Sequence, residues 1–292
     1  MKHYQSAWRQ PGMLALLAVM ILPSCTEKGP DIQLTNERRA FKDSTYVASE
    51  IEAPQQKRVV LEEFTGVGCP NCPEADTLID NFLKKYENLI VLGYHDSSSY
   101  FTLPYGNERD LRTDEAKALN NLLSPFTGRP AASIDRKQFS GESNLVLGTG
   151  KWANYISQRT QSSTPVNMSL STRYEDSTRS LSVEVRVHYT SPENQLNRLT
   201  IAIIENDIIT KQALGGGEYD TNYTQKHVLV GTLTNAKGTS LNENLEQGRT
   251  IIESYRKELP KEWVADNCKV VAFVARSGSS KTILQGTKES VE

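Results

Sequence analysis

The first half of the chain alternates between short apolar runs and segments with helical spacing. Residues 59–64 form a β-rich apolar run, and residues 89–96 form an almost continuous one. Apolar side chains recur at helical intervals over 73–83, 106–123 and 151–157, and a short strand ends at Ile134. The resulting order of strand, helix, strand, helix, strand and helix predicts an α/β domain over residues 56–164.

From Val166 the pattern changes to alternating apolar and polar residues. Such runs recur between polar turns at 167–172, 181–189, 199–205, 226–230, 270–275 and 281–284. Several short strands at near-regular spacing predict an antiparallel β-sandwich of immunoglobulin or fibronectin type over residues 165–292. Gly215-Gly216-Gly217 lies among them without a following helix start of Lys and Ser or Thr, so we interpret it as a loop and not as a phosphate site. The scattered Tyr219, Tyr223, His227 and Trp263 could line a binding surface, but we expect them to serve in core or loop packing.

The amino terminus has the pattern of an export signal. Lys2 and Arg9 precede an apolar run of about ten residues, which is too short to span a bilayer but has the length of a signal-peptide core. The run ends in Leu22-Pro23-Ser24-Cys25, which resembles a bacterial lipobox with an uncommon proline. That resemblance implies removal of residues 1–24 and acylation of Cys25, which would hold the protein on a membrane. The alternative is an ordinary secretory signal that ends near a cysteine.

The residues after Cys25 indicate where the protein is anchored and what it does not bind. Thr26 is not the aspartate that resembles an inner-membrane retention signal, so we expect the outer membrane, on its periplasmic or its cell-surface face. Residues 25–55 are polar and largely without period, which predicts a tether. The 268 residues that follow the signal carry 31 basic against 35 acidic side chains, with no cluster of Lys or Arg longer than a pair. We therefore expect no nucleic-acid partner.

The candidate chemistry is the sequence Cys69-Pro70-Asn71-Cys72. It follows the strand 59–64 and the turn Thr65-Gly66-Val67-Gly68, and it opens the helical segment. A strand, a tight turn and a helix with two cysteines at its first turn are the layout of a thiol–disulfide redox site. The free N–H groups and the positive end of the helix dipole favour a thiolate, so we expect an exposed Cys69 of low pKa and a shielded Cys72. An exported protein meets an oxidising environment, where such a pair can form a disulfide.

This layout and a distant proline resemble thioredoxin-like domains. Thr127-Gly128-Arg129-Pro130 precedes the strand 131–134, and a proline, usually cis, begins the strand that faces the two cysteines in such domains. The resemblance implies that Cys69 is the nucleophile, Cys72 the resolving cysteine and Pro130 the cis-proline. It also implies that Glu63, six residues before Cys69, is a buried acid that moves protons for Cys72. Pro70 and Asn71 between the cysteines, and Pro73 after them, depart from the thioredoxin pattern and leave the direction of electron flow open.

Two further residues have alternative interpretations. His95 ends the strand 89–96 at the sheet edge expected for the chemistry, where it could tune Cys69 or move protons, although a solvated strand-end histidine is the commoner case. Cys268 precedes an apolar strand and is interpreted as a buried, inert thiol. A structural zinc site needs four ligands in paired spacing, and no second Cys-x-x-Cys or close pair of histidines exists here, so we expect no metal and no other cofactor.

Together, the lipobox, the thioredoxin-like domain and the carboxyl-terminal β-domain resemble the twenty-eight-kilodalton outer-membrane-protein family of Bacteroidetes lipoproteins. The stretches 66–73 and 223–229 carry this resemblance most specifically. Members are described as surface or outer-membrane proteins and sometimes as adhesins. Two functions follow: an envelope thiol–disulfide oxidoreductase that acts on cysteine-containing proteins or a redox partner, and a surface binding or adhesion lipoprotein with the thioredoxin-like domain as scaffold.

Overall fold

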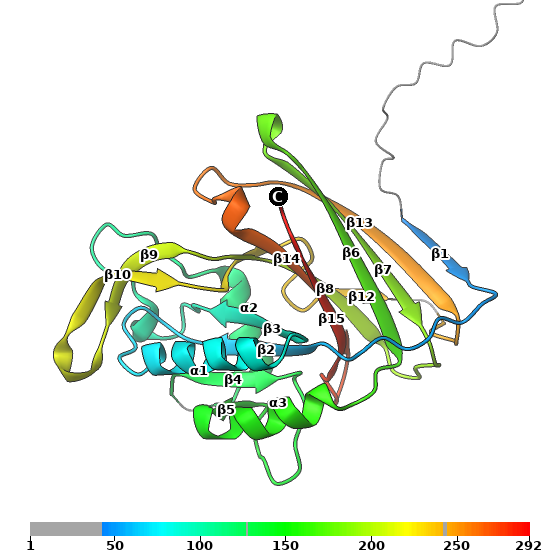
Figure 1. Ribbon diagram of the computed structural model, residues 1–292, viewed down its shortest axis with the longest axis horizontal. Helices are drawn as coiled ribbons and strands as arrows, with labels where there is room; N and C mark the ends of the chain where they lie inside the picture. The colour runs from blue at the N-terminus through cyan, green and yellow to red at the C-terminus, as the bar shows by residue number, and fades with distance from the viewer. Residues whose placement is uncertain (1–42, 127, 242–243) are drawn as a thin grey trace, which may run out of the picture. The chain divides into compact units, whose positions relative to one another are not determined.

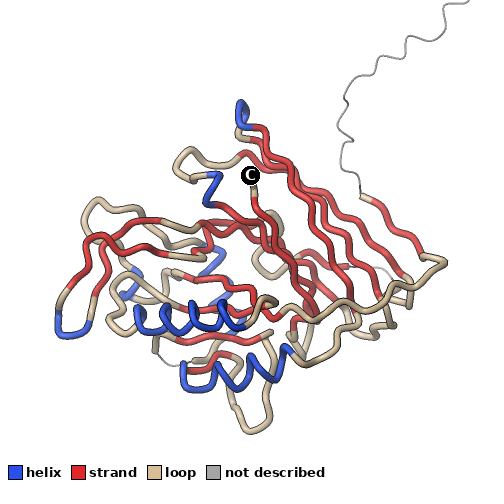
Figure 2. Tube along the Cα trace, viewed as in Figure 1, coloured by secondary structure: helices blue, strands red, loops and turns tan. Residues whose placement is uncertain are grey.

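The computed structural model describes residues 43–126, 128–241 and 244–292, and these are mostly β-sheet (Figures 1 and 2). Their helices are α1 (Cys72–Lys85), α2 (Asp114–Leu123) and α3 (Trp152–Thr160). Short 3-10 helices are η1 (Tyr100–Thr102), η2 (Thr149–Lys151), η3 (Asp176–Thr178), η4 (Gly215–Gly217) and η5 (Ala265–Asn267). No helix in the described ranges is long and apolar enough to cross a membrane.

The larger sheet has nine strands and joins both halves of the sequence. Its order is β15-β14-β8-β11-β3-β2-β4-β5, and β12 pairs with β8. The strands are β2 (Val59–Phe64), β3 (Leu89–Tyr94), β4 (Ala131–Ile134), β5 (Val146–Gly148), β8 (Asn197–Glu205), β11 (Val228–Thr232), β12 (Thr239–Leu241), β14 (Cys268–Arg276) and β15 (Ile283–Ser290). β2 and β3 are parallel, β2 and β4 are antiparallel, and β11 lies parallel to β3 with Val228 opposite Gly93.

Helices cover both faces of the sheet around β2 and β3. Val59 and Leu61 on one face pack against α1 and α3. The fully buried Trp152, at the start of α3, is the largest side chain in this core. Val60 and Phe64 on the other face pack against α2. Because successive side chains of a strand point to opposite faces, a strand buried on both sides needs a largely apolar run. Residues 89–94 provide one, and residues 59–64 do so apart from the buried Glu62 and Glu63.

A second sheet packs on the carboxyl-terminal part of the first. Its order is β1-β13-β7-β6, with β1 (Ser44–Val47), β6 (Val166–Glu175), β7 (Ser180–Tyr189) and β13 (Arg249–Glu258). Leu199 and Ile201 of β8 face this sheet in a shared apolar core, whereas Ala202 and Ile204 face the core of α2. The two sheets therefore form a sandwich-like pair, and β8 is buried on both faces.

A separate hairpin projects beside the amino end of α1. It consists of β9 (Ile208–Ala213) and β10 (Tyr219–Gln225), with η4 at its tip (Figure 1). Gly216 and Gly217 adopt positive φ in that tip, so the segment connects two strands as predicted, although it forms the short helix η4. The sequence pattern did not predict β9, β10 or β13.

Several sequence predictions need revision. The helix expected from residue 106 begins at Asp114, because the Thr113 hydroxyl accepts a hydrogen bond of 3.0 Å from Ala116 N and caps the helix there. Residues 44–47, inside the predicted tether, form β1 and pair with β13, while residues 25–42 lie outside the described ranges. The nine-stranded sheet also crosses the expected boundary at 164 and 165, so the sandwich is not built separately from the first half.

Candidate functional site

The cysteine loop connects the end of β2 to the start of α1. Helix α1 begins at Cys72, and Pro73 occupies its first turn, where a missing N–H leaves no helical hydrogen bond unmade. Gly66 and Gly68 pass close to the backbone of Phe101, and a Cβ on Gly66 would lie 2.5 Å from Phe101 O. Glycine is therefore required at this turn because another chain segment packs against it.

Cys69 and Cys72 form a disulfide, and both residues are buried, each with 1% of its surface exposed. Cys72 N also donates a hydrogen bond of 3.2 Å to Cys69 O within the loop. The prediction that Cys69 is the exposed cysteine is therefore wrong for the disulfide form. The cover comes from segments distant in sequence, which local pattern cannot reveal.

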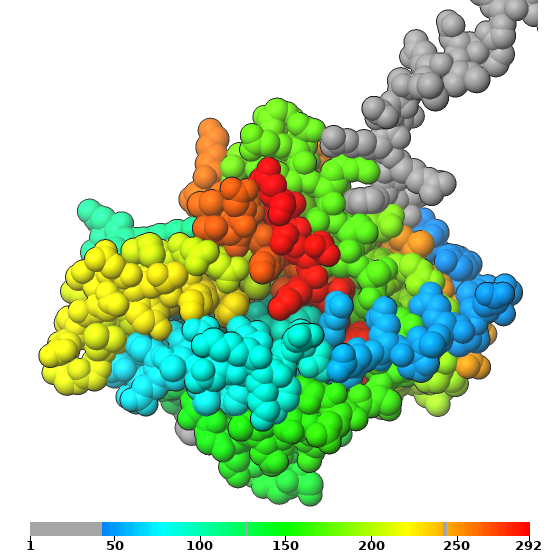
Figure 3. Space-filling model, in the orientation of Figure 1, coloured from blue at the N-terminus to red at the C-terminus, as the bar shows by residue number. Residues whose placement is uncertain are grey.

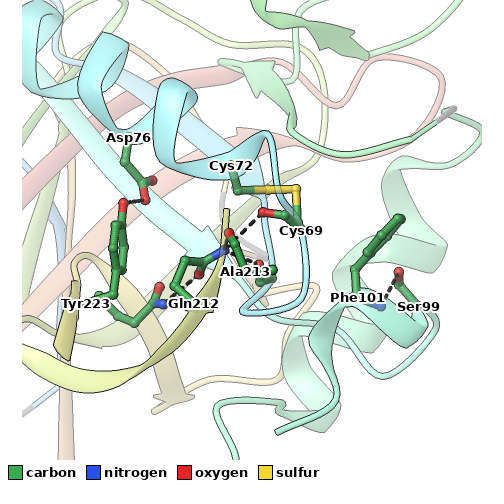
Figure 4. Close-up of a disulfide and its surroundings, with 10 residues drawn as sticks. Cys69, Cys72, Asp76, Ser99, Phe101, Gln212, Ala213 and Tyr223 are labelled. Carbon is green, nitrogen blue, oxygen red and sulfur yellow. Dashed lines mark hydrogen bonds between the residues drawn. A yellow bond between two sulfur atoms is a disulfide. The ribbon is translucent and has the colours of Figure 1, made fainter. Parts of the chain in front are cut away.

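The first of these segments is residues 99–103. Gly68 N donates a hydrogen bond of 2.7 Å to Phe101 O, and the Ser99 hydroxyl accepts one from Phe101 N (Figure 4). These contacts hold Phe101 against the turn that precedes Cys69.

The second segment is the β9–β10 hairpin, which hydrogen-bonds directly to the cysteine loop. The Gln212 side-chain amide donates to Cys69 O at 3.0 Å and to Gly66 O at 3.3 Å, and Ala213 N donates to Val67 O at 2.8 Å. Gln225 on the partner strand donates to Gln212 Oε1 at 2.9 Å and so orients the amide. Figure 4 shows Gln212 and Ala213 beside the disulfide, and Figure 3 shows the hairpin, in yellow, lying against α1, in cyan.

The predicted buried acid, Glu63, lies on the α1 side of the sheet. Side chains along β2 point alternately to the two faces of the sheet. Glu63 therefore points to the same face as Val59 and Leu61, opposite to the face of Val60 and Phe64. Glu63 is buried, and its Oε1 has no hydrogen-bond partner among the described residues. Burial, and secondarily the charge of Asp76, raise the pKa of the Glu63 carboxyl well above its ordinary value.

Asp76 is a second carboxyl that the sequence interpretation missed. It lies one helical turn after Cys72 and accepts a hydrogen bond of 2.5 Å from the Tyr223 hydroxyl on β10 (Figure 4). Burial raises the pKa of Asp76, and the hydrogen bond from Tyr223 opposes that shift. The spacing of four from Cys72 to Asp76 was a usable signal, whereas nothing local linked Tyr223 to α1.

The predicted proline lies where β4 begins. The Arg129–Pro130 peptide bond is cis, and β4 follows directly. Arg129 forms an ion pair with the buried Asp96, two residues after β3, which holds the residue before the proline close to the sheet. Thr127, in the same segment, lies outside the described residues.

His95 and Cys268 are both buried. His95 is 1% exposed, neither ring nitrogen has a hydrogen-bond partner in the described part of the chain, and burial lowers its pKa to about 4. A solvated strand-end histidine is therefore the wrong interpretation, and His95 is neutral near pH 7. Cys268 is not in a disulfide, and its predicted burial is confirmed; burial raises the pKa of its thiol to about 12, which disfavours the reactive thiolate.

The described residues contain no group of three or more His, Cys, Asp or Glu side chains placed to hold a metal ion. The predicted lipid-bearing Cys25 lies outside the described ranges.

A family model described as "Outer membrane protein Omp28" matches residues 118–292, more than half of the chain. The chain belongs to the Omp28 family. The predicted outer-membrane family is thereby confirmed, and the protein is an outer-membrane protein. The matched range includes the 223–229 stretch but not Cys69 or Cys72, so membership of the family says nothing about the disulfide.

The chain is also similar to solved structures. HBP35 of Porphyromonas gingivalis is 20% identical, with a TM-score of 0.62 over 82% of this chain and 77% of that one; at this identity the likeness shows the fold alone. A domain of the outer membrane lipoprotein Omp28 from Porphyromonas gingivalis is 16% identical over 44% of this chain and 89% of its own, with a TM-score of 0.31. The comparison with curated proteins found no match.

Proposed function

We propose that this outer-membrane protein is a thiol–disulfide oxidoreductase that acts through Cys69 and Cys72. The observation that carries the proposal is the disulfide at the start of α1 together with the buried Glu63 carboxyl at the end of β2, whose Oε1 has no hydrogen-bond partner among the described residues. A carboxyl with a raised pKa, on the strand that leads into a dithiol loop, is suited to accept and return the proton of a thiol.

The arrangement around the disulfide supports a thioredoxin-like unit over residues 56–164. Parallel β2 and β3 are connected through α1, the cis-proline Pro130 precedes antiparallel β4, and α3 packs on the same face as α1. These features follow the order expected of that fold. In this proposal the unit is not independent, because β11 extends its sheet beside β3.

The proposed reaction is a two-step exchange. In the reduced protein the Cys69 thiolate attacks one sulfur of a substrate disulfide, which forms a mixed disulfide and releases the other sulfur as a thiolate that takes up a proton. Cys72 then loses its proton and attacks Cys69 Sγ, which releases the second substrate thiol and restores the Cys69–Cys72 bond. Two electrons pass to the substrate, and a dithiol donor must return two electrons to the protein.

The burial of both sulfurs requires that the cover open during this cycle. Substrate must reach Cys69 Sγ, so residues 99–103, the β9–β10 hairpin or both have to move from the cysteine loop. The hydrogen bonds from Gln212, Ala213 and Gly68 are the contacts that such an opening breaks. Local opening of this kind costs less than global unfolding.

The proposal includes attachment through acyl chains on Cys25, which would place the site close to a membrane and among cysteine-containing envelope proteins. Several acyl chains on one residue suffice for stable anchoring. Pro130 and His95 enter the proposal differently: Pro130 borders the substrate position, whereas the buried and neutral His95 has at most an indirect role.

The second candidate function is a surface binding or adhesion protein in which the disulfide only stabilises the loop. The complete burial of Cys69 and Cys72 favours this alternative. Dithiothreitol-dependent reduction of insulin separates the two functions. We expect the purified wild-type protein to accelerate insulin precipitation and Cys69→Ser to abolish the acceleration. Cys268→Ser, which changes a buried cysteine outside the site, is the matched control. If wild type and Cys69→Ser precipitate insulin at the same rate, the oxidoreductase proposal fails and the binding or adhesion function is favoured.

A further inference from the structure

A second acidic group lies on the same side of α1 as the resolving cysteine. Cys72 and Asp76 are four residues apart in this helix, so their side chains follow one another along one face. Asp76 is only partly buried, in contrast to Glu63. The helix therefore places a carboxyl group between the enclosed part of the site and its surface.

Tyr223 holds that carboxyl from the other half of the chain. Its hydroxyl donates to Asp76 Oδ2 at 2.5 Å, and Lys226, just after β10, forms an ion pair of 2.7 Å with Asp80 one turn further along α1. Burial and the charge of Asp76 raise the pKa of Tyr223, so the phenol keeps its proton and remains the donor. The hairpin thus positions Asp76 on the helix.

The Glu63 side chain is too deeply buried to exchange a proton directly with solvent. The residue is buried, and its Oε1 lacks a partner in the described ranges. Asp76 is nevertheless close enough for its charge to raise the pKa of Glu63. The charged or titratable groups that act on Asp76 are Glu63 on β2, Asp80 on α1, Tyr223 on β10 and Lys226 after β10.

We propose that Asp76 relays the Cys72 proton between Glu63 and solvent, and that Tyr223 is the positioning residue that holds Asp76 in place. This inference rests on the proposed function and adds the hairpin to the redox site. When Cys72 attacks Cys69 Sγ of the mixed disulfide, its proton passes to the Glu63 carboxylate, then to the Asp76 carboxylate and then to water. The electron pair of the Cys72 sulfur forms the new S–S bond, and the departing substrate sulfur leaves with the pair of the broken bond and takes up a proton.

The test separates the two chemical steps with dithiobis(nitrobenzoate), a small aromatic disulfide. The full chain is reduced and freed of reductant in a background of Cys25→Ala and Cys268→Ala, so that only Cys69 and Cys72 react. The first thionitrobenzoate released reports attack by Cys69, and the second reports resolution by Cys72. Both rates are measured as a function of pH.

We expect Asp76→Asn to slow the second release about tenfold, less than the roughly 100-fold that a positioned acid–base group typically contributes, and to leave the first release unchanged. The midpoint of the second step should also move to lower pH, because the charge that raises the pKa of Glu63 is gone. Tyr223→Phe keeps the ring but removes the hydroxyl that holds Asp76, so it should also slow the second release, as Asp76→Asn does. A purely structural role would not change the pH midpoint.

Matched controls lie on the same hairpin. Tyr219→Phe and Asp220→Asn make the same chemical changes on β10 away from Asp76, and both should retain wild-type rates and midpoint. If wild type shows both releases and Asp76→Asn and Tyr223→Phe share its pH profile, the relay is overturned while the oxidoreductase stands. If wild type shows no second release, the proposed function itself fails.

Discussion

The side-chain amide of Gln212 donates a hydrogen bond of 3.0 Å to the carbonyl oxygen of Cys69, 143 residues earlier in the chain. The carboxyl-terminal half of the protein therefore contacts the backbone of the proposed nucleophile itself. This contact connects the accessibility of the disulfide to the attachment of the β9–β10 hairpin.

Removing the Gln212 amide should make the disulfide easier to reduce. A hydrogen bond contributes about 1 kcal/mol net, so Gln212→Ala should increase the population of the open state, and hence the reduction rate, about fivefold per lost bond. The measurement is the rate at which dithiothreitol exposes Cys69 and Cys72 to alkylation. Gln195→Ala, at an exposed position, should match wild type. Equal rates in Gln212→Ala and wild type would show that the hairpin does not limit access.

A methyl group at Gly66 should destabilise the protein. The added Cβ would lie 2.5 Å from Phe101 O and 2.9 Å from Phe101 C, so the 99–103 segment would have to move. We expect Gly66→Ala to lower the free energy of unfolding by about 1–3 kcal/mol, as overpacking commonly does. Urea unfolding followed by circular dichroism provides the value. Gly150→Ala, where no atom lies within 4 Å of the added Cβ, is the control and should change it little.

Glu63 should make the oxidised protein less stable as pH rises. Its pKa is raised in the folded state, so above its unfolded value of about 4.5 the folded protein retains a proton that the unfolded chain has released. The favourable contribution of the protonated group is complete below that value and is lost as pH rises toward the folded pKa. Glu63→Gln should therefore flatten the decrease in unfolding free energy above pH 4.5. Unfolding curves across this range, with exposed Glu87→Gln as control, test it; a slope unchanged by Glu63→Gln would contradict the burial of an acid there.

His95 should act in the opposite direction. Burial lowers its pKa from 6.5 to about 4, so between these values the unfolded chain binds a proton that the folded protein does not. Its neutral, buried state therefore costs stability as pH falls through this window. His95→Phe should remove that acid sensitivity, which the difference between variant and wild-type unfolding free energies from pH 7 to pH 4 would reveal. A difference that stays constant with pH would mean that His95 is solvated.

The membrane attachment is tested at Cys25. Because acyl chains supply the proposed anchor, Cys25→Ala should move the protein from the membrane fraction to the soluble fraction. Fractionation followed by detergent-free washing measures the distribution, and Cys268→Ala should remain with the membranes. Retention of Cys25→Ala after washing would require a different anchor.

Local pattern predicted those parts of the molecule that depend on neighbouring residues. Local pattern is sufficient for the apolar runs of β2 and β3, the cysteine pair at the start of α1 and the alternation of β6 and β7, because each depends on only a few neighbouring positions. The burial of Glu63 was expected from the resemblance to thioredoxin-like domains and not from local pattern, because its strand also carries Glu62. Local pattern did not predict where α2 begins. The apolar spacing extends back to residue 106, but the Thr113 hydroxyl caps the helix, so it begins at Asp114.

Only the tertiary structure decided how the two halves combine. The β-strand pattern of 199–205 and 226–230 is satisfied by a separate sandwich or by extension of the β2–β3 sheet, and long-range packing selects the extension. Whether Cys69 is exposed depends on Phe101 and Gln212, and the partner of Asp76 is Tyr223 on a hairpin far along the chain. By itself the sequence determined the chemical groups of the site, whereas their accessibility and proton connections arise from contacts between distant segments, which local periodicity does not encode.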